Sequence, residues 1–119
     1  MAIPHAACGE VVDVRPLGEA LSGAVTRTIV KTTELEVIRI VLPANHELPP
    51  HRVPGEITVQ CLEGKVAFRV GEVERELTGG QFLFVEGGVE HALRARDDSS
   101  LLVTIVLKSK NNPQGRANG

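Results

Sequence analysis

Hydrophobic and polar residues alternate along most of the middle of the chain. In residues 35–42, LEVIRIVL, one side of an extended chain carries Ile38, Ile40 and Leu42, and the other side includes Arg39. A period of two residues is typical of a β-strand with one buried face. Segments of the same type predict strands over residues 24–31, 35–42, 57–62, 65–70, 72–77, 81–86, 91–95 and 101–107.

Turn residues separate these segments. Gly64, Gly71 and Gly80 each fall between two predicted strands, where glycine is typical of a tight turn. No stretch of ten or more residues has a helical stripe, and only residues 17–21, LGEAL, suit a short helical turn. We interpret residues 44–50, ANHELPP, as a loop. Short strands with glycine and proline between them predict an all-β sandwich or barrel.

The length of 119 residues fits a single domain. We expect an N-terminal arm over residues 1–15, a β-barrel domain over residues 16–108 and a flexible tail over residues 109–119. The tail is polar, contains glycine and proline, and has no large apolar residue to anchor it.

Composition and charge exclude several classes of partner. Hydrophobic residues make up 42% of the chain, as in ordinary globular proteins. No apolar run approaches the roughly 18 residues of a membrane helix, and no signal peptide is visible, so we expect a cytoplasmic protein without a membrane partner. The net charge is -2, with no Trp or Tyr and no basic stripe, which argues against nucleic-acid binding. Cys8 and Cys61 are too few for a disulfide framework, so we expect two reduced thiols.

Five residues in the predicted strands and turns match two known motifs in order. His51 and Gly64 take the first His and the closing Gly of one motif, and Gly80, Gly88 and His91 match the second. Fifteen residues separate Gly64 from Gly80. With these matches the chain resembles small single-domain cupins of the RmlC-like superfamily. The resemblance implies a double-stranded β-helix, that is, a jelly-roll-like barrel, with its motif core over residues 45–95.

The chain also departs from the cupin motifs. Asn45 stands at the opening Gly, Val53 at the second His and Ile57 at the Glu of the first motif. In the second motif Glu86 replaces the Pro and Ala95 replaces the Asn. The resemblance implies four metal ligands, three His and one Glu, and only two of the His positions are kept.

One hypothesis is a metal-dependent enzyme of dioxygenase or isomerase type. His51 and His91 would hold a weakly bound divalent metal (iron, zinc, nickel or manganese) together with a non-standard third ligand. Glu56 is a candidate if a bulge after Pro54-Gly55 re-aims its side chain, since a one-residue offset in a strand points to the other face. His46 is the other candidate.

A second hypothesis is a metal-free pocket for a small, largely apolar molecule with a polar or anionic head. The expected lining is His51, Val53, Ile57, Val59, Cys61 and His91. An apolar wall with two imidazoles is a reasonable ligand site, in which a His could bind a carbonyl or carboxylate or act as a general base. We expect Cys61 to be an inert core thiol.

A third hypothesis is a non-catalytic regulatory or scaffold protein. Cupins that resemble this chain are often homodimers in which an N-terminal strand crosses to the partner, and residues 25–31, VTRTIVK, could do so. The cations available to a ligand are expected on the solvated surface; they are Arg39, Arg52, Lys65 and Arg69.

Overall fold

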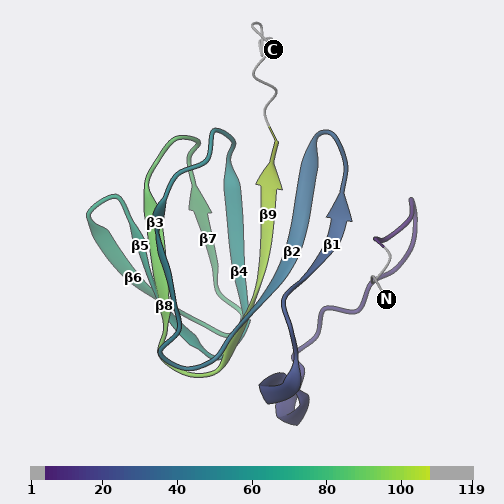
Figure 1. Ribbon diagram of the computed structural model, residues 1–119, viewed down its shortest axis with the longest axis horizontal. Coiled ribbons are helices and arrows are strands. Elements are labelled where there is room, and N and C mark those ends of the chain that lie inside the picture. Colours follow the sequence, from purple (N-terminus) through teal and green to yellow (C-terminus); the bar gives the residue numbers. More distant parts are fainter. Residues whose placement is uncertain (1–4, 108–119) are drawn as a thin grey trace, which may run out of the picture.

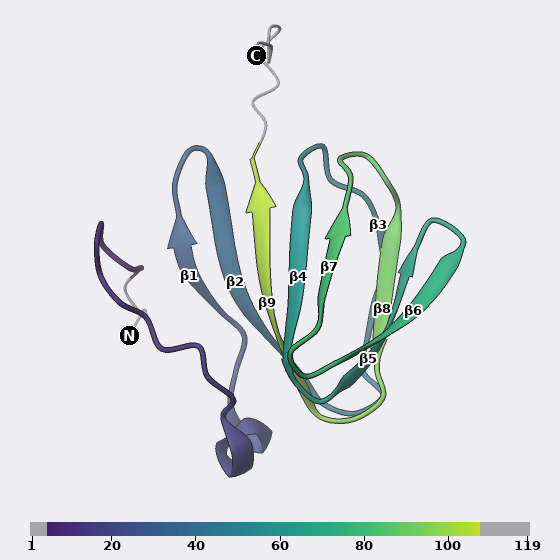
Figure 2. The ribbon, with the colours of Figure 1, turned by 180° about the vertical axis from the view of Figure 1, so that it is seen from behind.

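The computed structural model describes residues 5–107 as two antiparallel β-sheets that face each other (Figure 1, Figure 2). One sheet has the strand order β1-β2-β9-β4-β7, and the other has the order β3-β8-β5-β6. The elements are the 3₁₀ helix η1 (Gly18–Gly23) and the strands β1 (Arg27–Lys31), β2 (Leu35–Leu42), β3 (Glu47–His51), β4 (Ile57–Glu63), β5 (Lys65–Val70), β6 (Val73–Thr78), β7 (Phe82–Val85), β8 (His91–Ala95) and β9 (Ser99–Val106).

The prediction of an all-β protein is confirmed, and eight of the nine strands described were predicted. The short helical turn predicted near residues 17–21 is η1. The strand that was missed is β3, because Pro49 and Pro50 lie inside it. Proline lacks a backbone N–H and is tolerated in edge strands, and β3 is the edge strand of its sheet.

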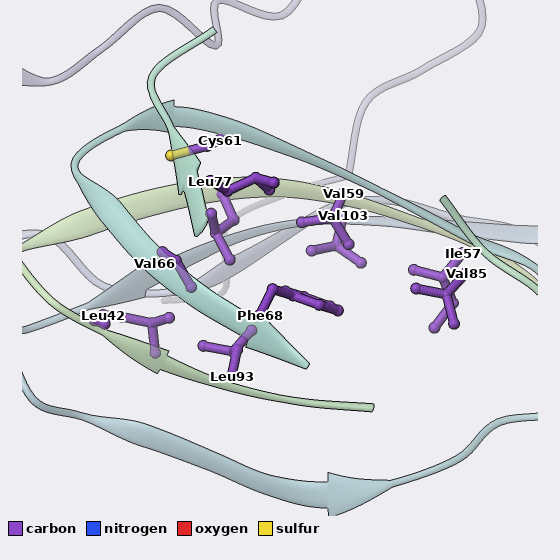
Figure 3. Close-up of a cluster of buried hydrophobic side chains, with 12 residues drawn as sticks. Leu42, Ile57, Val59, Cys61, Val66, Phe68, Leu77, Val85, Leu93 and Val103 are labelled. Atoms are coloured by element: carbon purple, nitrogen blue, oxygen red, sulfur yellow. The ribbon is translucent and has the colours of Figure 1, made fainter. Parts of the chain in front are cut away.

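The sheets meet over an apolar core that alternation largely predicts (Figure 3). The core cluster is Leu42, Ile57, Val59, Cys61, Val66, Phe68, Leu77, Val85, Leu93, Ala95, Leu101 and Val103. Two polar residues extend this core, since Ser99 and Ser100 belong to β9 and are completely buried, whereas the predicted strand begins at residue 101. The Ser99 hydroxyl explains its burial, because it donates to the Asp97 carbonyl at 2.7 Å and accepts from the Lys65 N–H at 3.0 Å.

The barrel has two distinct ends. At one end, which we call the histidine end, β3 finishes at His51, β8 begins at His91 and β4 begins at Ile57. At the other, the Glu63 end, a turn at Gly64 joins β4 to β5 (Figure 1). Gly64 has φ +93°, and a side chain there would collide with Ser99, so only glycine suits this turn.

The Glu63 end contains a buried ion pair that corrects one sequence expectation. Arg39 is only 6% exposed and is not a solvated cation. Its Nη2 donates to the Arg15 carbonyl at 2.7 Å and lies 3.4 Å from the Glu63 carboxylate. That carboxylate also accepts from the Ser100 hydroxyl at 2.6 Å and from the backbone N–H of Leu17 at 3.0 Å. The network therefore ties the N-terminal segment to the sheet.

Of the predicted domain bounds, the tail at residues 109–119 lies outside the described residues. The segment that precedes η1 has no strand or helix between residues 5 and 17, and its backbone is tied to β1 by the bond from the Ala6 N–H to the Ile29 carbonyl at 2.8 Å. Among residues 5–107 no helix is long and apolar enough to cross a membrane.

Candidate functional site

Two histidines meet at the histidine end. His51 and His91 are direct partners in the pairing of β3 with β8, so their side chains lie on the same face. Their ring centroids are 4.3 Å apart with the planes at 61°. His91 is only 6% exposed and stacks on Phe68 at 6.1 Å, whereas His51 is exposed. The pair thus has one buried and one accessible ring.

The backbone sets the tautomer of both rings. His51 Nδ1 lies 3.2 Å from the Pro49 carbonyl, and His91 Nδ1 lies 3.1 Å from the Val89 carbonyl. A carbonyl oxygen only accepts, so each Nδ1 must carry the hydrogen that it donates. In a neutral ring Nε2 then has the free lone pair. Two neutral imidazoles in this arrangement offer hydrogen-bond acceptors, not donors, to a third group.

Burial keeps His91 in the neutral form. Removal of its ring from water lowers the pKa of His91, the Val89 carbonyl opposes this change, and the nearby His51 lowers the pKa further. Because the pKa lies below its ordinary value of about 6.5, His91 is predominantly uncharged at neutral pH.

Three of the apolar residues expected to line the site belong to the core or pack against it. Ile57 is 4% exposed and Val59 is 1% exposed, and both point into the core. Val53 is partly buried and packs against the same cluster. Figure 3 shows Ile57 next to Val85, its partner across the β4–β7 pair, at one end of the cluster.

Two residues near the expected site were not predicted: Phe68, which stacks on His91, and Val85, which pairs with Ile57. Both lie in predicted strands, and both occupy the positions of the strand alternation that face inward. The missing information was which strands meet at the histidine end, and this depends on the pairing of β4 with β7 and of β5 with β8.

Cys61 lies away from the histidine pair. It is completely buried at the far end of β4 (Figure 3), four residues from Ile57 or about 13 Å along an extended strand. Its Sγ faces the Glu63 carbonyl at 3.5 Å, and burial raises the pKa of the thiol. This environment is that of an unreactive core thiol.

Neither proposed third metal ligand reaches the pair. Glu56 is exposed between two buried neighbours, Gly55 and Ile57. The local backbone cannot turn to re-aim it, because Gly55 packs directly on the Val106 carbonyl and the Glu56 carbonyl accepts from the Val106 N–H at 2.9 Å. The bulge that would make Glu56 a third ligand is therefore not present.

His46 lies at the Glu63 end. Its carbonyl accepts from the Ala95 N–H at 2.9 Å, and Ala95 is four residues along β8 from His91, about 13 Å away. Between residues 5 and 107 no three His, Cys, Asp or Glu side chains are grouped as metal ligands would be. The usual cupin donor set does not fit the residues present, since Val53 and Ile57 occupy its other positions.

Glu36 was not predicted as a residue near the site, although its carboxylate lies on the inner side of the sheet. The strand pairing places Glu36 in the same row as Ile57 and Ile105. Its carboxylate is paired with Lys31 Nζ at 3.4 Å. The sequence pattern contained this information, because Glu36 lies two residues before Ile38 and residues two apart share one face of a strand.

Two of the expected surface cations border the histidine end. Arg52 and Arg69 line a hollow of about 600 Å³ together with Glu90. The Glu90 carboxylate lies 3.9 Å from the Arg52 guanidinium and 3.8 Å from that of Arg69. The side chain of Arg52 is 66% exposed, so this pairing is a solvated one and contributes little to stability.

The family of the chain is established by sequence. A model of the cupin domain matches residues 38–107, more than half of the chain, and the chain belongs to the cupin family. No significantly similar sequence is found among curated proteins.

Solved structures agree on the fold. A conserved protein of unknown function from Streptococcus pyogenes is 22% identical with a TM-score of 0.72, over 92% of this chain and 96% of that one. An RmlC-like cupin from Shewanella frigidimarina is 21% identical with a TM-score of 0.67, over 72% of this chain and 78% of that one. A salicylate 1,2-dioxygenase from Pseudaminobacter salicylatoxidans is 20% identical with a TM-score of 0.63, over 67% of this chain and 25% of that one. The predicted cupin barrel is confirmed.

Proposed function

We propose that this cupin binds a small organic molecule at the histidine end, with an apolar body against Ile57 and Phe68 and a polar head at His51 and His91. The observation that supports this proposal is the pair of Nδ1–H groups held by backbone carbonyls at 3.2 and 3.1 Å. Because each Nδ1 is held by a carbonyl, each ring keeps Nε2 for a ligand, and the His91 ring stacks on the apolar Phe68. Polar groups that converge beside apolar residues are typical of a ligand site. Binding requires no turnover, so a sensor or carrier role satisfies the proposal as well as an enzyme does.

The tautomers favour a head group that donates hydrogen bonds. The sequence predicts a carbonyl or carboxylate as the head group, but these groups only accept hydrogen bonds, and the Nε2 atom of a neutral ring also only accepts. A hydroxyl, an amine or a protonated acid satisfies the pair. A carboxylate would need a protonated ring, which the lowered pKa of His91 disfavours.

A matched pair of fragments tests this proposal. Benzyl alcohol and benzoate share the aromatic body and differ in the head group. Titration at pH 7.5, followed by the imidazole signals in nitrogen-15 NMR, should show that benzyl alcohol perturbs both histidines and that benzoate does not. His91→Phe, which keeps an aromatic ring on Phe68, should abolish the response. Stronger binding of benzoate, or an unchanged response in the variant, would contradict the proposed site.

The second candidate is a metal-dependent cupin enzyme, and one observation favours it. Metal-binding histidines usually donate their other ring N–H to a carbonyl or carboxylate, as His51 and His91 do here. Two ligands are fewer than the three usual for catalytic zinc or non-haem iron. The residues described therefore do not provide a complete metal set, and we place this function second.

Metal content separates the two candidates. The protein would be purified without a His tag, washed with a mild chelator and analysed by plasma mass spectrometry. The metal-free proposal predicts less than about a tenth of an equivalent per chain, also after metal is added back. Near one equivalent of iron, zinc, nickel or manganese would make the enzyme the leading function. The cytoplasmic location and the absence of a nucleic-acid partner stay predictions from the sequence.

A further inference from the structure

One carboxylate interrupts the apolar row at the histidine end. The strand register places Glu36 of β2 opposite Ile105 of β9, and Ile105 opposite Ile57 of β4. Residues directly opposite each other in antiparallel strands point to the same side of the sheet. Ile57 belongs to the core and Ile105 packs against it. The side chain of Glu36 therefore lies on the inner side of the sheet, two strands or about 10 Å from Ile57.

Glu36 is at the same end of the barrel as the histidine pair. The strand β2 begins at Leu35, which is paired with Val106 near the end of β9, and Figure 1 shows this end of both strands beside the start of β4. In the facing sheet, β3 finishes at His51 and β8 begins at His91. A molecule that lies along the apolar row with its head at the imidazoles therefore extends toward Glu36.

The Glu36 carboxylate is more buried than its charged partner. The side chain of Glu36 is 19% exposed, whereas that of Lys31 is 49% exposed. Lys31 lies on the edge strand β1, on the far side of β2 from Ile105, and its Nζ donates to Oε1 of Glu36 at 3.4 Å. Within residues 5–107 no group donates a hydrogen bond to Oε2 of Glu36. A carboxylate accepts several hydrogen bonds, so this oxygen has capacity for a donor on a ligand.

We propose that Glu36 is a specificity-determining residue of this site and that the ligand is a small amine whose protonated nitrogen binds the Glu36 carboxylate. This inference rests on the proposed function, which supplies the apolar wall and the acceptors at His51 and His91. An alkylammonium, like that of lysine, is cationic at neutral pH and forms a charge-assisted hydrogen bond to a carboxylate. A ligand carboxylate would instead be repelled by the like charge of Glu36.

The two polar ends of such a ligand are recognised differently. The neutral imidazoles of His51 and His91 accept hydrogen bonds without a charge, which suits a hydroxyl, whereas the Glu36 carboxylate attracts a cation. Lys31 weakens this attraction, because its own ammonium competes for the same carboxylate. The predicted ligand class is therefore a hydroxy amine with an apolar body between the hydroxyl and the ammonium group.

Two probes that differ only in the amine test the inference. Tyramine and para-ethylphenol share the phenol and the two-carbon chain, and only tyramine has the ammonium group. Dissociation constants would be measured at pH 7.5 and low salt from the imidazole signals in nitrogen-15 NMR. We expect wild type to bind tyramine at least about fivefold more tightly than para-ethylphenol. Glu36→Gln, which keeps the shape of the side chain, should bind the two probes equally.

Two further charge variants serve as controls. Glu56→Gln removes the same charge at the same end of the barrel, but Glu56 is exposed and precedes the inward-pointing Ile57, so this variant should keep the preference for tyramine. Lys31→Gln removes the competing cation and should increase the preference by about twofold or more. Circular dichroism and thermal melting verify that each variant is folded.

The outcomes separate this inference from the proposed function. If para-ethylphenol perturbs both imidazoles and tyramine binds wild type no more tightly, the ligand site stands and the role of Glu36 is overturned, whether or not any variant folds. A preference for tyramine that persists in Glu36→Gln, or that Glu56→Gln reduces equally, also overturns it. If neither probe perturbs the imidazoles, the proposed function fails and this inference fails with it.

Discussion

The two ends of this barrel treat buried polar groups in opposite ways. At the Glu63 end the carboxylate accepts from the Leu17 and Gly18 N–H groups and the Ser100 hydroxyl, and it faces Arg39. At the histidine end each imidazole has one backbone partner and one free nitrogen. The Glu63 carboxylate thus has its hydrogen-bond partners within the protein, whereas the imidazoles of His51 and His91 each keep one nitrogen that a ligand can bind.

The difference does not lie in burial. Arg39 and His91 have the same exposed fraction, 6%. Arg39 uses Nη2 in three contacts and is held against the N-terminal segment, although its Nε is buried without a partner among residues 5–107. The ring of His91 has one backbone partner and packs against the exposed ring of His51. The number of side-chain partners, and not the depth, distinguishes the Arg39 network from the histidine pair.

The largest effect should come from filling the turn at the Glu63 end. Gly64→Ala combines a positive φ with a collision against the Ser99 backbone, so we expect the free energy of unfolding to fall by about 4 kcal/mol. Gly80→Ala is the control, because Gly80 has a similar φ of +90° but open space around it, and we expect a loss of about 1 kcal/mol. Urea unfolding measures both. Equal losses would mean that close packing at Gly64 is unimportant.

The next largest effect should come from breaking the buried ion pair. Glu63→Ala leaves the Arg39 guanidinium buried without its carboxylate and frees the Leu17 N–H, which should destabilise the protein by about 3 kcal/mol. The double variant with Arg39→Met should recover part of this loss, because no unpaired charge remains. Losses that simply add would show that the two residues do not interact.

The pH dependence of stability should distinguish the two ends. Burial alone would raise the pKa of Glu63, but hydrogen bonds from Leu17, Ser100 and Gly18 and the charge of Arg39 outweigh it, so the pKa is lowered. The pKa of His91 is also lowered, first by burial. A lowered folded pKa means that stability is complete above the unfolded pKa and is lost as the pH falls below it.

Two separate steps follow from these directions. Acidification should reduce the melting temperature first below about pH 6.5, because the unfolded chain then binds the proton that buried His91 resists, and again below about pH 4.3 because of Glu63. His91→Gln should lack the upper step and Glu63→Gln the lower one. Thermal melts from pH 8 to pH 3 measure both. An upper step that persists in His91→Gln would assign it to another group.

The smallest effect on stability should come from replacing the exposed thiol of Cys8, which thiol labelling distinguishes from that of Cys61. Cys8 is exposed, whereas Cys61 is buried with a raised pKa. An aromatic disulfide reagent should therefore label one thiol per native chain quickly and the second only upon unfolding. Cys8→Ser should remove the fast phase and leave stability unchanged within about 0.5 kcal/mol. Fast labelling of Cys61 would contradict its placement in the core.

Much of the fold and part of the site could be predicted from local pattern. The alternation in residues 35–42 and 65–70 predicts β2 and β5 at their observed bounds. His51 and His91 were identified by motif spacing, and their pairing is consistent with that identification. The strand β3 could not be predicted, because the tolerance of Pro49 depends on its being at the edge of a sheet.

The sequence by itself determined the alternation, the turns and the cupin spacing, and these are local properties set by side-chain period and by glycine. Only the tertiary structure decided that Arg39 is buried and paired, that Glu56 points outward, and that His46 and Cys61 lie far from the histidine pair. The physical reason is that a strand repeats every two residues whatever surrounds it. Which face becomes interior, and which polar groups find partners, depends on contacts between residues far apart in the chain, such as Arg39 with Glu63.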